Sequence, residues 1–373
     1  MRSVKNLIVG CGLSGAVLAQ RLAGQKNEEV LLIDRRSHIG GNIFDYKDTQ
    51  TGITVHQYGP HVFHTRSKEV WDYLSQFTQW HRFMYRVKAV IDGREVNIPF
   101  NLDSLYSVFP HTLAEKLEIK LLEKFGFNQK VPILELRQTS DKDLNFLAQY
   151  VYEKVFLGYT TKQWGVKPEE LDPSVSARVP VYISRDDRYF QDAYQAIPQN
   201  GYTSLVKNML KHPQIHVELN TDFQAVKNKI HYERLFFTGA IDEFFDYELG
   251  RLPYRSLDIV FRTHNVPYLQ SGPQINYPEN YDYTRSVEYK YYLDEKADKT
   301  VVSYEYSCPF EEGKNERYYP IPDAQNQALY DRYAAKAKEL KNVWFLGRLG
   351  DYKYYNMDQT VLRALQLAGE IAK

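Results

Sequence analysis

The chain has few cysteines and no excess of charge of either sign. Cys11 and Cys308 are too few for a disulfide framework or a cysteine metal cluster, which is typical of a protein from a reducing compartment. Its 47 Lys and Arg residues balance 47 Asp and Glu residues, so the formal net charge is 0. Nucleic-acid affinity depends on a surplus of cations facing phosphates, so this balance argues against a nucleic-acid partner. Any phosphate recognition must be local.

The sequence also lacks a long uncharged hydrophobic run. No stretch approaches the roughly 18 apolar residues that a membrane helix needs. The apolar run at residues 4–9 has the length of a strand, is interrupted by Lys5 and Asn6, and leads into a glycine turn, unlike a signal peptide. We therefore expect a soluble, cytoplasmic protein without a membrane span.

Tyrosine is the residue that the chain has in quantity. Aromatic residues make up 14% of the sequence, with 31 Tyr against 19 Phe and 4 Trp. A tyrosine ring offers an apolar face and a hydroxyl tip, which suits the recognition of sugars and bases. Half-buried core tyrosines explain the same composition equally well. With 373 residues, of which 43% are hydrophobic, the chain is long enough for two or three structural units.

The pattern of elements changes along the chain and returns at its end. The first forty residues read as a strand at 4–9, a helix at 16–23 and a strand at 30–33, and the last fifty return to this style with a helix, a strand and a final helix. Leucines at helical spacing between residues 100 and 155 predict a helical insertion, and residues 252–306, rich in Tyr, Val and Thr, predict an antiparallel sheet. We therefore predict an α/β fold with a Rossmann-like domain built from discontinuous segments, an inserted helical domain and an antiparallel β-sheet domain. The boundaries we assign are 1–84, 190–243 and 323–373 for the Rossmann-like domain, 100–160 for the helical domain with a mobile loop at 163–182, and 85–99 with 244–322 for the sheet domain that carries substrate.

A glycine fingerprint indicates a dinucleotide site near the N-terminus. Residues 10–15 (GCGLSG) match G-x-G-x-x-G directly after a predicted strand and before a predicted helix. These glycines permit a tight turn, a close approach of backbone to a pyrophosphate, and close packing of helix on strand. Asp34 ends the second predicted strand, where an acidic residue accepts hydrogen bonds from ribose hydroxyls. A purely structural turn is the less favoured reading.

Further glycine turns favour FAD over NAD as the dinucleotide. Arg35 precedes the doublet Gly40-Gly41, and residues 345–351 are again a strand followed by glycine, leading through residues 356–358 into a helix. A long cofactor needs this second contact, with a helix N-terminus facing the flavin. A third strand-to-glycine turn at residues 236–240 is predicted to lie near the adenosine half.

Local motifs elsewhere are more specific than the fingerprint, and they show a resemblance to one family. They are YGPHVFHT at 58–65, GYTTKQWG at 158–165, RVPV at 178–181, DDRYF at 186–190, YTR at 283–285, YYPIP at 318–322 and GRLGDYKY at 347–354. In this set the sequence resembles the bacterial UDP-galactopyranose mutases, from residue 4 to about residue 371.

The resemblance implies a flavoenzyme that interconverts UDP-galactopyranose and UDP-galactofuranose and supplies galactofuranose for cell-surface polysaccharides. No net oxidation occurs, but the FAD must be reduced, because its N5 attacks the anomeric carbon while UDP leaves and later returns. Bacterial members are commonly homodimers, so we expect a homodimer here.

The resemblance also assigns roles to individual residues. Arg178 and Arg285 match arginines that clamp the diphosphate, for which a planar guanidinium fork is well suited. His61 is placed against the flavin near N5 and the sugar, and Arg348 near the isoalloxazine, so these four form the predicted catalytic set. The predicted substrate-binding residues are Tyr159, Trp164, Arg178, Tyr189, Asn276, Arg285, Tyr319, Tyr354 and Asn356. The predicted FAD-binding residues are Gly10, Gly12, Leu13, Ser14, Gly15, Asp34, Arg35, Gly41, Asn42, His61, Thr238, Gly239, Gly347, Arg348, Asn356, Met357 and Asp358.

Several alternatives stay open at this point. Core packing is a second reading of Tyr159 and Trp164, and Tyr318 is interpreted as structural. The H-x-x-H spacing of His61 and His64 has no carboxylate or cysteine neighbour, so no metal site is predicted. Asn356 stands where some members have an acidic residue.

The substrate, too, has rival readings. Relatives that act on UDP-N-acetylgalactopyranose have an arginine in place of His61, so His61 favours the plain sugar. Tyr85 stands where relatives can have a smaller polar residue, which bears on the uridine or sugar end of the pocket. An amine-oxidase-like or protoporphyrinogen-oxidase-like flavoenzyme would share the FAD motifs but has no use for diphosphate arginines. A binding module without catalysis is disfavoured, because flavin-facing and phosphate-facing motifs occur together.

Overall fold

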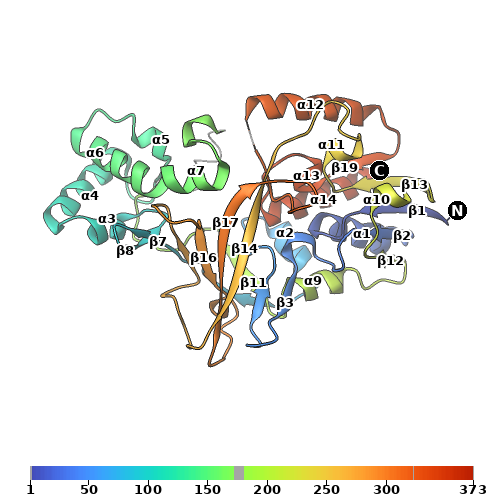
Figure 1. Ribbon diagram of the computed structural model, residues 1–373, viewed down its shortest axis with the longest axis horizontal. Helices are drawn as coiled ribbons and strands as arrows, with labels where there is room; N and C mark the ends of the chain where they lie inside the picture. The colour runs from blue at the N-terminus through green and yellow to red at the C-terminus, as the bar shows by residue number, and fades with distance from the viewer. Residues whose placement is uncertain (1, 172–179, 322, 373) are drawn as a thin grey trace.

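The computed structural model describes residues 2–171, 180–321 and 323–372 (Figure 1). At one end of the molecule lies a five-stranded parallel sheet with the strand order β12-β2-β1-β13-β19. Its strands are β1 (Arg2–Val9), β2 (Val30–Ile33), β12 (Ile215–Glu218), β13 (Ile230–Phe237) and β19 (Val343–Phe345). Strands from both ends of the chain therefore share one sheet.

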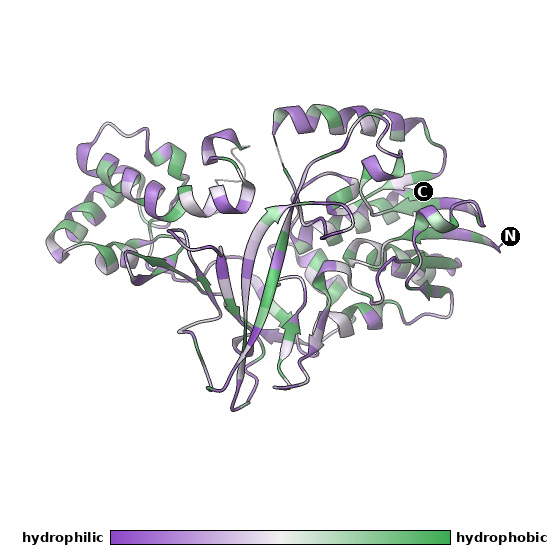
Figure 2. Ribbon diagram, viewed as in Figure 1, coloured by the Kyte–Doolittle hydropathy of each residue, from purple (hydrophilic) through white to green (hydrophobic). Residues whose placement is uncertain are grey.

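Apolar residues explain why β1 is the central strand of this sheet. Leu7 pairs with Leu31 on one side and Leu235 on the other, and all three are fully buried. Helices α1 (Leu13–Lys26) and α14 (Met357–Ala372) pack on each other beside this sheet. Figure 2 shows hydrophobic residues gathered around α1 and the parallel strands.

A seven-stranded sheet occupies the middle of the molecule, in the order β18-β14-β17-β16-β15-β7-β8. Only the β15–β7 pair is parallel; the other pairs are antiparallel. The strands are β7 (Val87–Ile91), β8 (Arg94–Ile98), β14 (Tyr254–His264), β15 (Gln274–Asn276), β16 (Arg285–Glu288), β17 (Thr300–Pro309) and β18 (Tyr319–Pro320). The long strands β14 and β17 lie between the parallel-sheet unit and the helical group (Figure 1).

The helical group lies at the other end of the molecule (Figure 1). It consists of α3 (Leu102–Val108), α4 (His111–Phe125), α5 (Ile133–Leu136), α6 (Lys142–Val151), the π-helix η2 (Tyr152–Leu157) and α7 (Gly158–Trp164). Side-chain caps fix two of its helix starts. Asn101 forms a capping box with Ser104 before α3, and the Asp141 carboxylate accepts hydrogen bonds from the backbone of Asp143 and Leu144 in α6.

The remaining elements are short and connect these parts. They are η1 (Gly41–Ile43), β3 (Asp45–Lys47), β4 (Thr54–His56), β5 (Phe63–Thr65), α2 (Lys68–Leu74), β6 (Trp80–Arg82), β9 (Lys130–Val131), η3 (Pro168–Glu170), β10 (Val181–Tyr182), β11 (Tyr194–Pro198), α9 (Tyr202–Met209), α10 (Phe223–Val226), α11 (Ile241–Phe244), η4 (Tyr289–Tyr291), α12 (Ala324–Glu339) and α13 (Gly347–Gly350).

The predicted fold class is confirmed: a Rossmann-like unit made from both chain ends, an inserted helical group, and a largely antiparallel sheet. Of the helices in the described residues, none is long and apolar enough to cross a membrane. The described ends of the loop predicted to be mobile are packed, since Trp164, Pro168 and Leu171 are buried and Val181 pairs with Val131. Mobility stays a prediction for residues 172–179, which lie outside the described residues.

Candidate functional site

Two adjoining cavities lie between the parallel-sheet unit and the seven-stranded sheet. The first has a volume of about 250 Å³ and the second about 380 Å³. Four residues line both of them: Asn42, His61, Arg348 and Met357. A group bound in the first cavity would therefore meet a group bound in the second at these four side chains.

The first cavity is built on the N-terminus of helix α1. The N-cap Gly12 supplies no side-chain cap, and the first helical residues, Leu13 and Ser14, line the cavity with it. Uncapped N–H groups and the positive end of the helix dipole bind anions. A β-carbon on Gly41, where φ is +56°, would lie 2.8 Å from the Cα of Gly12. Glycine at position 41 permits this approach of the two backbones, whereas a β-carbon on Gly12 would lie 3.9 Å from the Cα of Gly41, an ordinary contact.

The other fingerprint glycines serve the turn itself. Gly10 has φ +104°, and a β-carbon there would lie 2.0 Å from Oγ1 of Thr238. A β-carbon on Gly15 would lie 2.1 Å from the carbonyl oxygen of Gly10. Gly15 does not line the cavity. Gly15 allows α1 to lie close against the turn, and its contact with FAD stays a prediction.

Asp34 stands at the end of β2, as predicted, and lines the first cavity. Its carboxylate accepts hydrogen bonds from the backbone N–H of Cys11 at 2.7 Å and of Arg36 at 2.9 Å. These bonds hold the side chain in place, and each carboxylate oxygen has a further lone pair for a ribose hydroxyl. Arg35 and Arg36 both donate to Glu316, at 2.7 and 2.8 Å.

Most residues predicted to bind FAD line the first cavity. They are Gly10, Gly12, Leu13, Ser14, Asp34, Arg35, Gly41, Asn42, His61, Thr238, Gly239, Gly347, Arg348 and Met357. Asn356 lines the second cavity instead. Asp358 lines neither, because its carboxylate accepts hydrogen bonds from the Thr65 hydroxyl at 2.9 Å and the Gln359 backbone at 2.8 Å.

A buried ion pair places the arginine of the second cavity. Nε of Arg285, on β16, donates to Oε2 of Glu305, on the adjacent β17, at 2.6 Å. The Glu305 side chain is 0% exposed and that of Arg285 is 18% exposed. Burial raises the pKa of Glu305, and the guanidinium opposes that shift. Burial would lower the pKa of Arg285, but Glu305 raises it well above its usual value, so the cation persists. The Nη groups are the part of the fork that a ligand would meet.

His61 is held as a neutral imidazole where the cavities join. Its Nδ1 lies 2.8 Å from the carbonyl of Gly59, so Nδ1 carries the proton and donates. Burial, with His56, Arg348 and Arg285 nearby, lowers the pKa of His61 to about 3. Nε2 is then an acceptor for a hydroxyl or an N–H group at the junction.

Aromatic rings form the opposite wall of the second cavity. Tyr319 and Tyr354 lie edge to face, with ring centroids 5.1 Å apart, and the Arg348 guanidinium lies 5.5 and 5.2 Å from the two rings. Trp164 packs behind them, 5.4 Å from Tyr354 and 5.9 Å from Tyr319. Burial raises the pKa of Tyr319 to about 12, so its hydroxyl stays protonated and able to donate.

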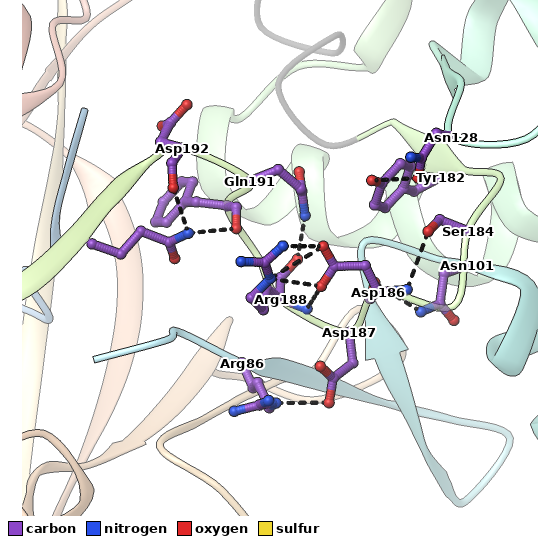
Figure 3. A network of polar contacts seen from close by, with 12 residues as sticks. Arg86, Asn101, Asn128, Tyr182, Ser184, Asp186, Asp187, Arg188, Gln191 and Asp192 are labelled. Atoms are coloured by element: carbon purple, nitrogen blue, oxygen red, sulfur yellow. Dashed lines mark hydrogen bonds and ion pairs between the residues drawn. The ribbon is translucent and has the colours of Figure 1, made fainter. Parts of the chain in front are cut away.

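A polar network holds the turn that brings Tyr189 into the cavity (Figure 3). The Arg188 guanidinium binds the Asp186 carboxylate in a fork, with N–O distances of 2.9 and 2.7 Å. The backbone N–H of Tyr189 donates to the carbonyl of Tyr85 at 2.7 Å. The Gln195 amide donates to the carbonyls of Phe190 and Asp192, both at 3.0 Å. The turn is therefore fixed on two sides.

The structure does not bring every predicted substrate residue to the cavities. Tyr189, Arg285, Tyr319, Tyr354 and Asn356 line the second cavity with His61 and Arg348. The other described residues of that prediction, Tyr159, Trp164 and Asn276, line neither cavity. Arg178 lies outside the described residues.

The second cavity has further lining residues: Tyr85, which the sequence analysis singled out, and Gln274, which it missed. At the inner end of the second cavity, Tyr85 lies beside Phe190, and its hydroxyl donates to Gln274. His64 also lines this end, its Nδ1 2.6 Å from Asp192 and its ring stacked on Phe190. Two further segments, 221–224 and 316–317, also line the first cavity, and neither belongs to a recognised motif. No local pattern in the sequence marks those two.

Comparison with known proteins identifies the family of this chain. A family model described as UDP-galactopyranose mutase matches residues 154–354, and one described as an NAD(P)-binding Rossmann-like domain matches residues 8–77. A probable UDP-galactopyranose mutase of Klebsiella pneumoniae is 38% identical over 99% of this chain and 95% of its own length. A dTDP-fucopyranose mutase of Escherichia coli is 36% identical over 98% of this chain and 97% of its own. A UDP-galactopyranose mutase of Mycoplasma pneumoniae is 33% identical over 98% of this chain and 95% of its own length.

Solved structures share the fold. A reduced UDP-galactopyranose mutase has a TM-score of 0.74 at 15% identity and covers 100% of this chain, which covers 94% of it. A putative protoporphyrinogen oxidase from Exiguobacterium has a TM-score of 0.63 at 12% identity, covering 100% of this chain and 99% of its own. At identities of 15% and 12%, these structures show the fold alone. The family is shown by the relatives with higher sequence identity. With a family model over more than half of its length and relatives above 30% identity over nearly all of it, the chain belongs to the UDP-galactopyranose mutase family.

Proposed function

We propose that this protein interconverts UDP-galactopyranose and UDP-galactofuranose, with reduced FAD in the first cavity and the nucleotide sugar in the second. The observation that carries the proposal is the junction of the cavities. A site suited to a dinucleotide opens beside His61 and Arg348 into a cavity with a buried arginine and tyrosine hydroxyls. An oxidase of amines takes a cationic substrate, which a buried arginine disfavours.

The chain's own residues hold the leaving group. Arg285 and the hydroxyls of Tyr189, Tyr319 and Tyr354 would bind the diphosphate and keep it near for its return. Reduced FAD would supply a nucleophilic nitrogen for the anomeric carbon. His61, neutral and acceptor at Nε2, would orient the sugar at that junction, and Arg348 would stabilise negative charge on the cofactor.

The remaining assignments belong to the same proposal. Arg178, Tyr159, Trp164, Asn276 and Asn356 complete the predicted substrate set, and the domain boundaries stay as predicted from the sequence. We place the protein in the cytoplasm as a homodimer that supplies galactofuranose for cell-surface polysaccharide.

A second candidate is the interconversion of dTDP-fucopyranose and its furanose form, the substrate named for the Escherichia coli relative. One observation favours it. At the inner end of the cavity the Tyr85 hydroxyl donates to Gln274, whose amide donates to Asn276 at 2.7 Å. The polar groups of Tyr85 and Gln274 are used in these hydrogen bonds, so the substrate meets the aromatic rings of Tyr85 and Phe190 at this end. Fucose has a methyl group where galactose has a hydroxymethyl group.

The experiment is a comparison of two substrates on one preparation. Dithionite-reduced protein is incubated with UDP-galactofuranose and, separately, with dTDP-fucofuranose, and the pyranose products are separated by chromatography. We expect UDP-galactopyranose to form with the higher kcat/KM. A higher kcat/KM for dTDP-fucofuranose would establish the second candidate, and no product from either would contradict both.

His61 gives a prediction on sugar specificity. Replacing His61 by Arg adds a cation and bulk at the junction of the cavities, so kcat/KM for UDP-galactose should fall by about tenfold or more. The ratio of kcat/KM for UDP-N-acetylgalactose to that for UDP-galactose should rise. His81→Arg, at a half-buried position outside both cavities, is the control. An unchanged ratio in His61→Arg would remove His61 from the specificity account.

A further inference from the structure

The ammonium group of Lys162, in helix α7, lies inside a ring of backbone carbonyls. It donates to the carbonyl oxygens of Tyr277, Glu279 at 3.0 Å, Tyr281 at 3.1 Å and Tyr283 at 3.3 Å. Every second carbonyl of residues 277–283 therefore converges on one nitrogen. No carboxylate of a described residue forms an ion pair with Lys162, so the ammonium contacts the loop through its backbone carbonyls.

This loop joins two strands that face the candidate substrate site. It runs from β15, which ends at Asn276, to β16, which begins at Arg285. Helix α7 packs directly on it, since a β-carbon on Gly158 would lie 2.0 Å from the carbonyl oxygen of Pro278. Lys162 thus links helix α7, which carries Tyr159, to the loop before Arg285 through hydrogen bonds.

The C-terminal end of α7 is anchored on the seven-stranded sheet by a separate set of bonds. Arg255, on β14, donates to the carbonyls of Gln163 at 3.0 Å and Lys162 at 3.1 Å. Ser307, on β17, also donates to the carbonyl of Gln163, at 2.8 Å. With the helix fixed in this way, the Lys162 side chain determines where the loop lies relative to the helix.

We propose that Lys162 is a positioning residue for nucleotide binding: its ammonium holds residues 277–283 so that Arg285, which follows this loop, lies correctly for the diphosphate. The inference rests on the proposed function only for the identity of the nucleotide. Lys162 lines neither cavity and acts through Arg285, which lines the second.

The surroundings of the ammonium make this contact sensitive to pH. Burial lowers the pKa of Lys162 to about 8, and the charge of Asp282 opposes that shift. The other groups around the loop keep their charge state near that pH. Burial raises the pKa of Tyr283 to about 12, two carboxylate partners raise the pKa of Lys154, and Arg255 is a guanidinium. Loss of the Lys162 proton leaves four carbonyls facing an uncharged amine, which weakens the contact.

The test measures UDP binding to the flavin-loaded protein by calorimetry, without turnover. Lys162→Met, which keeps the length of the side chain and removes its charge, should raise the Kd for UDP by about tenfold or more. Bound flavin per chain should stay unchanged. The control is Lys154→Met, because Lys154 contacts the same loop through the Glu279 carboxylate at 2.8 Å and not through the backbone. Its Kd should stay within about threefold of wild type.

A pH series separates positioning from a general loss of structure. Between about pH 7 and about pH 9.5 the wild-type Kd for UDP should rise by at least about threefold, and Lys162→Arg, which stays protonated, should show a flat profile. Normal UDP binding by Lys162→Met would overturn the inference. If that variant does not fold, a flat wild-type profile would overturn it. UDP binding that follows this pattern in a protein without mutase activity would leave the inference standing and contradict the proposed function.

Discussion

Replacing Arg285 by alanine is expected to lower kcat/KM for UDP-galactofuranose by at least about 100-fold while FAD stays bound. A charge-assisted contact to a buried phosphate is worth about 2 to 4 kcal/mol, or roughly 30- to 1,000-fold in rate. Arg285 lines the second cavity and not the first, so cofactor binding should be spared. The measurement is steady-state kinetics on reduced enzyme, normalised to bound flavin.

Two companion variants make the Arg285 result specific. Arg262→Ala removes an exposed arginine from β14 of the same sheet and should change kcat/KM by less than about threefold. Arg285→Lys keeps a cation beside the buried Glu305 but loses the planar fork, so its activity should fall between those of wild type and alanine. If Arg285→Ala kept activity within a few-fold, the diphosphate would have to bind elsewhere.

Replacing Gly41 by alanine is expected to weaken FAD binding by about tenfold or more. The new β-carbon would lie 2.8 Å from the Cα of Gly12, so the two backbones must separate where they line the first cavity. Overpacking of this kind costs about 1 to 3 kcal/mol. Titration of the flavin-free protein with FAD, followed by flavin fluorescence, gives the Kd.

Gly52 is a matched control for Gly41. It also has a positive φ, +72° against +56°, but a β-carbon there would meet nothing within 4 Å. Gly52→Ala therefore carries the cost of the left-handed backbone without the contact. Its Kd for FAD should match wild type. Equal losses of FAD affinity in the two variants would mean that backbone strain, and not the approach of Gly41 to Gly12, explains the effect.

Local patterns predicted the Rossmann-like unit closely. The helix expected at residues 16–23 is α1 (Leu13–Lys26), which begins at the glycine turn and ends at Asn27 in a left-handed conformation. The strand expected at 30–33 has those bounds. Glycine turns and short apolar runs are signals within a few residues, so sequence alone is sufficient to find them.

The sequence predicted an antiparallel sheet in this part of the chain, but it did not predict the order of the seven strands. Its β15–β7 pair joins Gln274 to Val87, which no local pattern specifies. The inner end of the second cavity depends on that pair, because it brings Gln274 beside Tyr85. Gln274, brought to the cavity in this way, was missed.

Site residues marked by a local motif could be found from the sequence, whereas those placed by contacts between distant segments could not. Asp34 and Arg348, which the glycine motifs marked as FAD-binding residues, line the first cavity. Lys162 lies in a motif, but its role depends on four carbonyls more than a hundred residues later in the chain. The contribution of segment 221–224 depends on β12 pairing with β2, which places the end of β12 beside Asp34.

The central claim is that reduced flavin serves as a nucleophile and is not consumed. The most direct measurement counts turnovers of UDP-galactofuranose under anaerobic conditions, in oxidised protein and in protein reduced by one equivalent of dithionite per flavin. We predict that the oxidised protein is nearly inactive and that the reduced protein converts many substrate molecules per flavin while its spectrum stays reduced. Equal rates in the two states, or one flavin reoxidised for each product formed, would contradict the account.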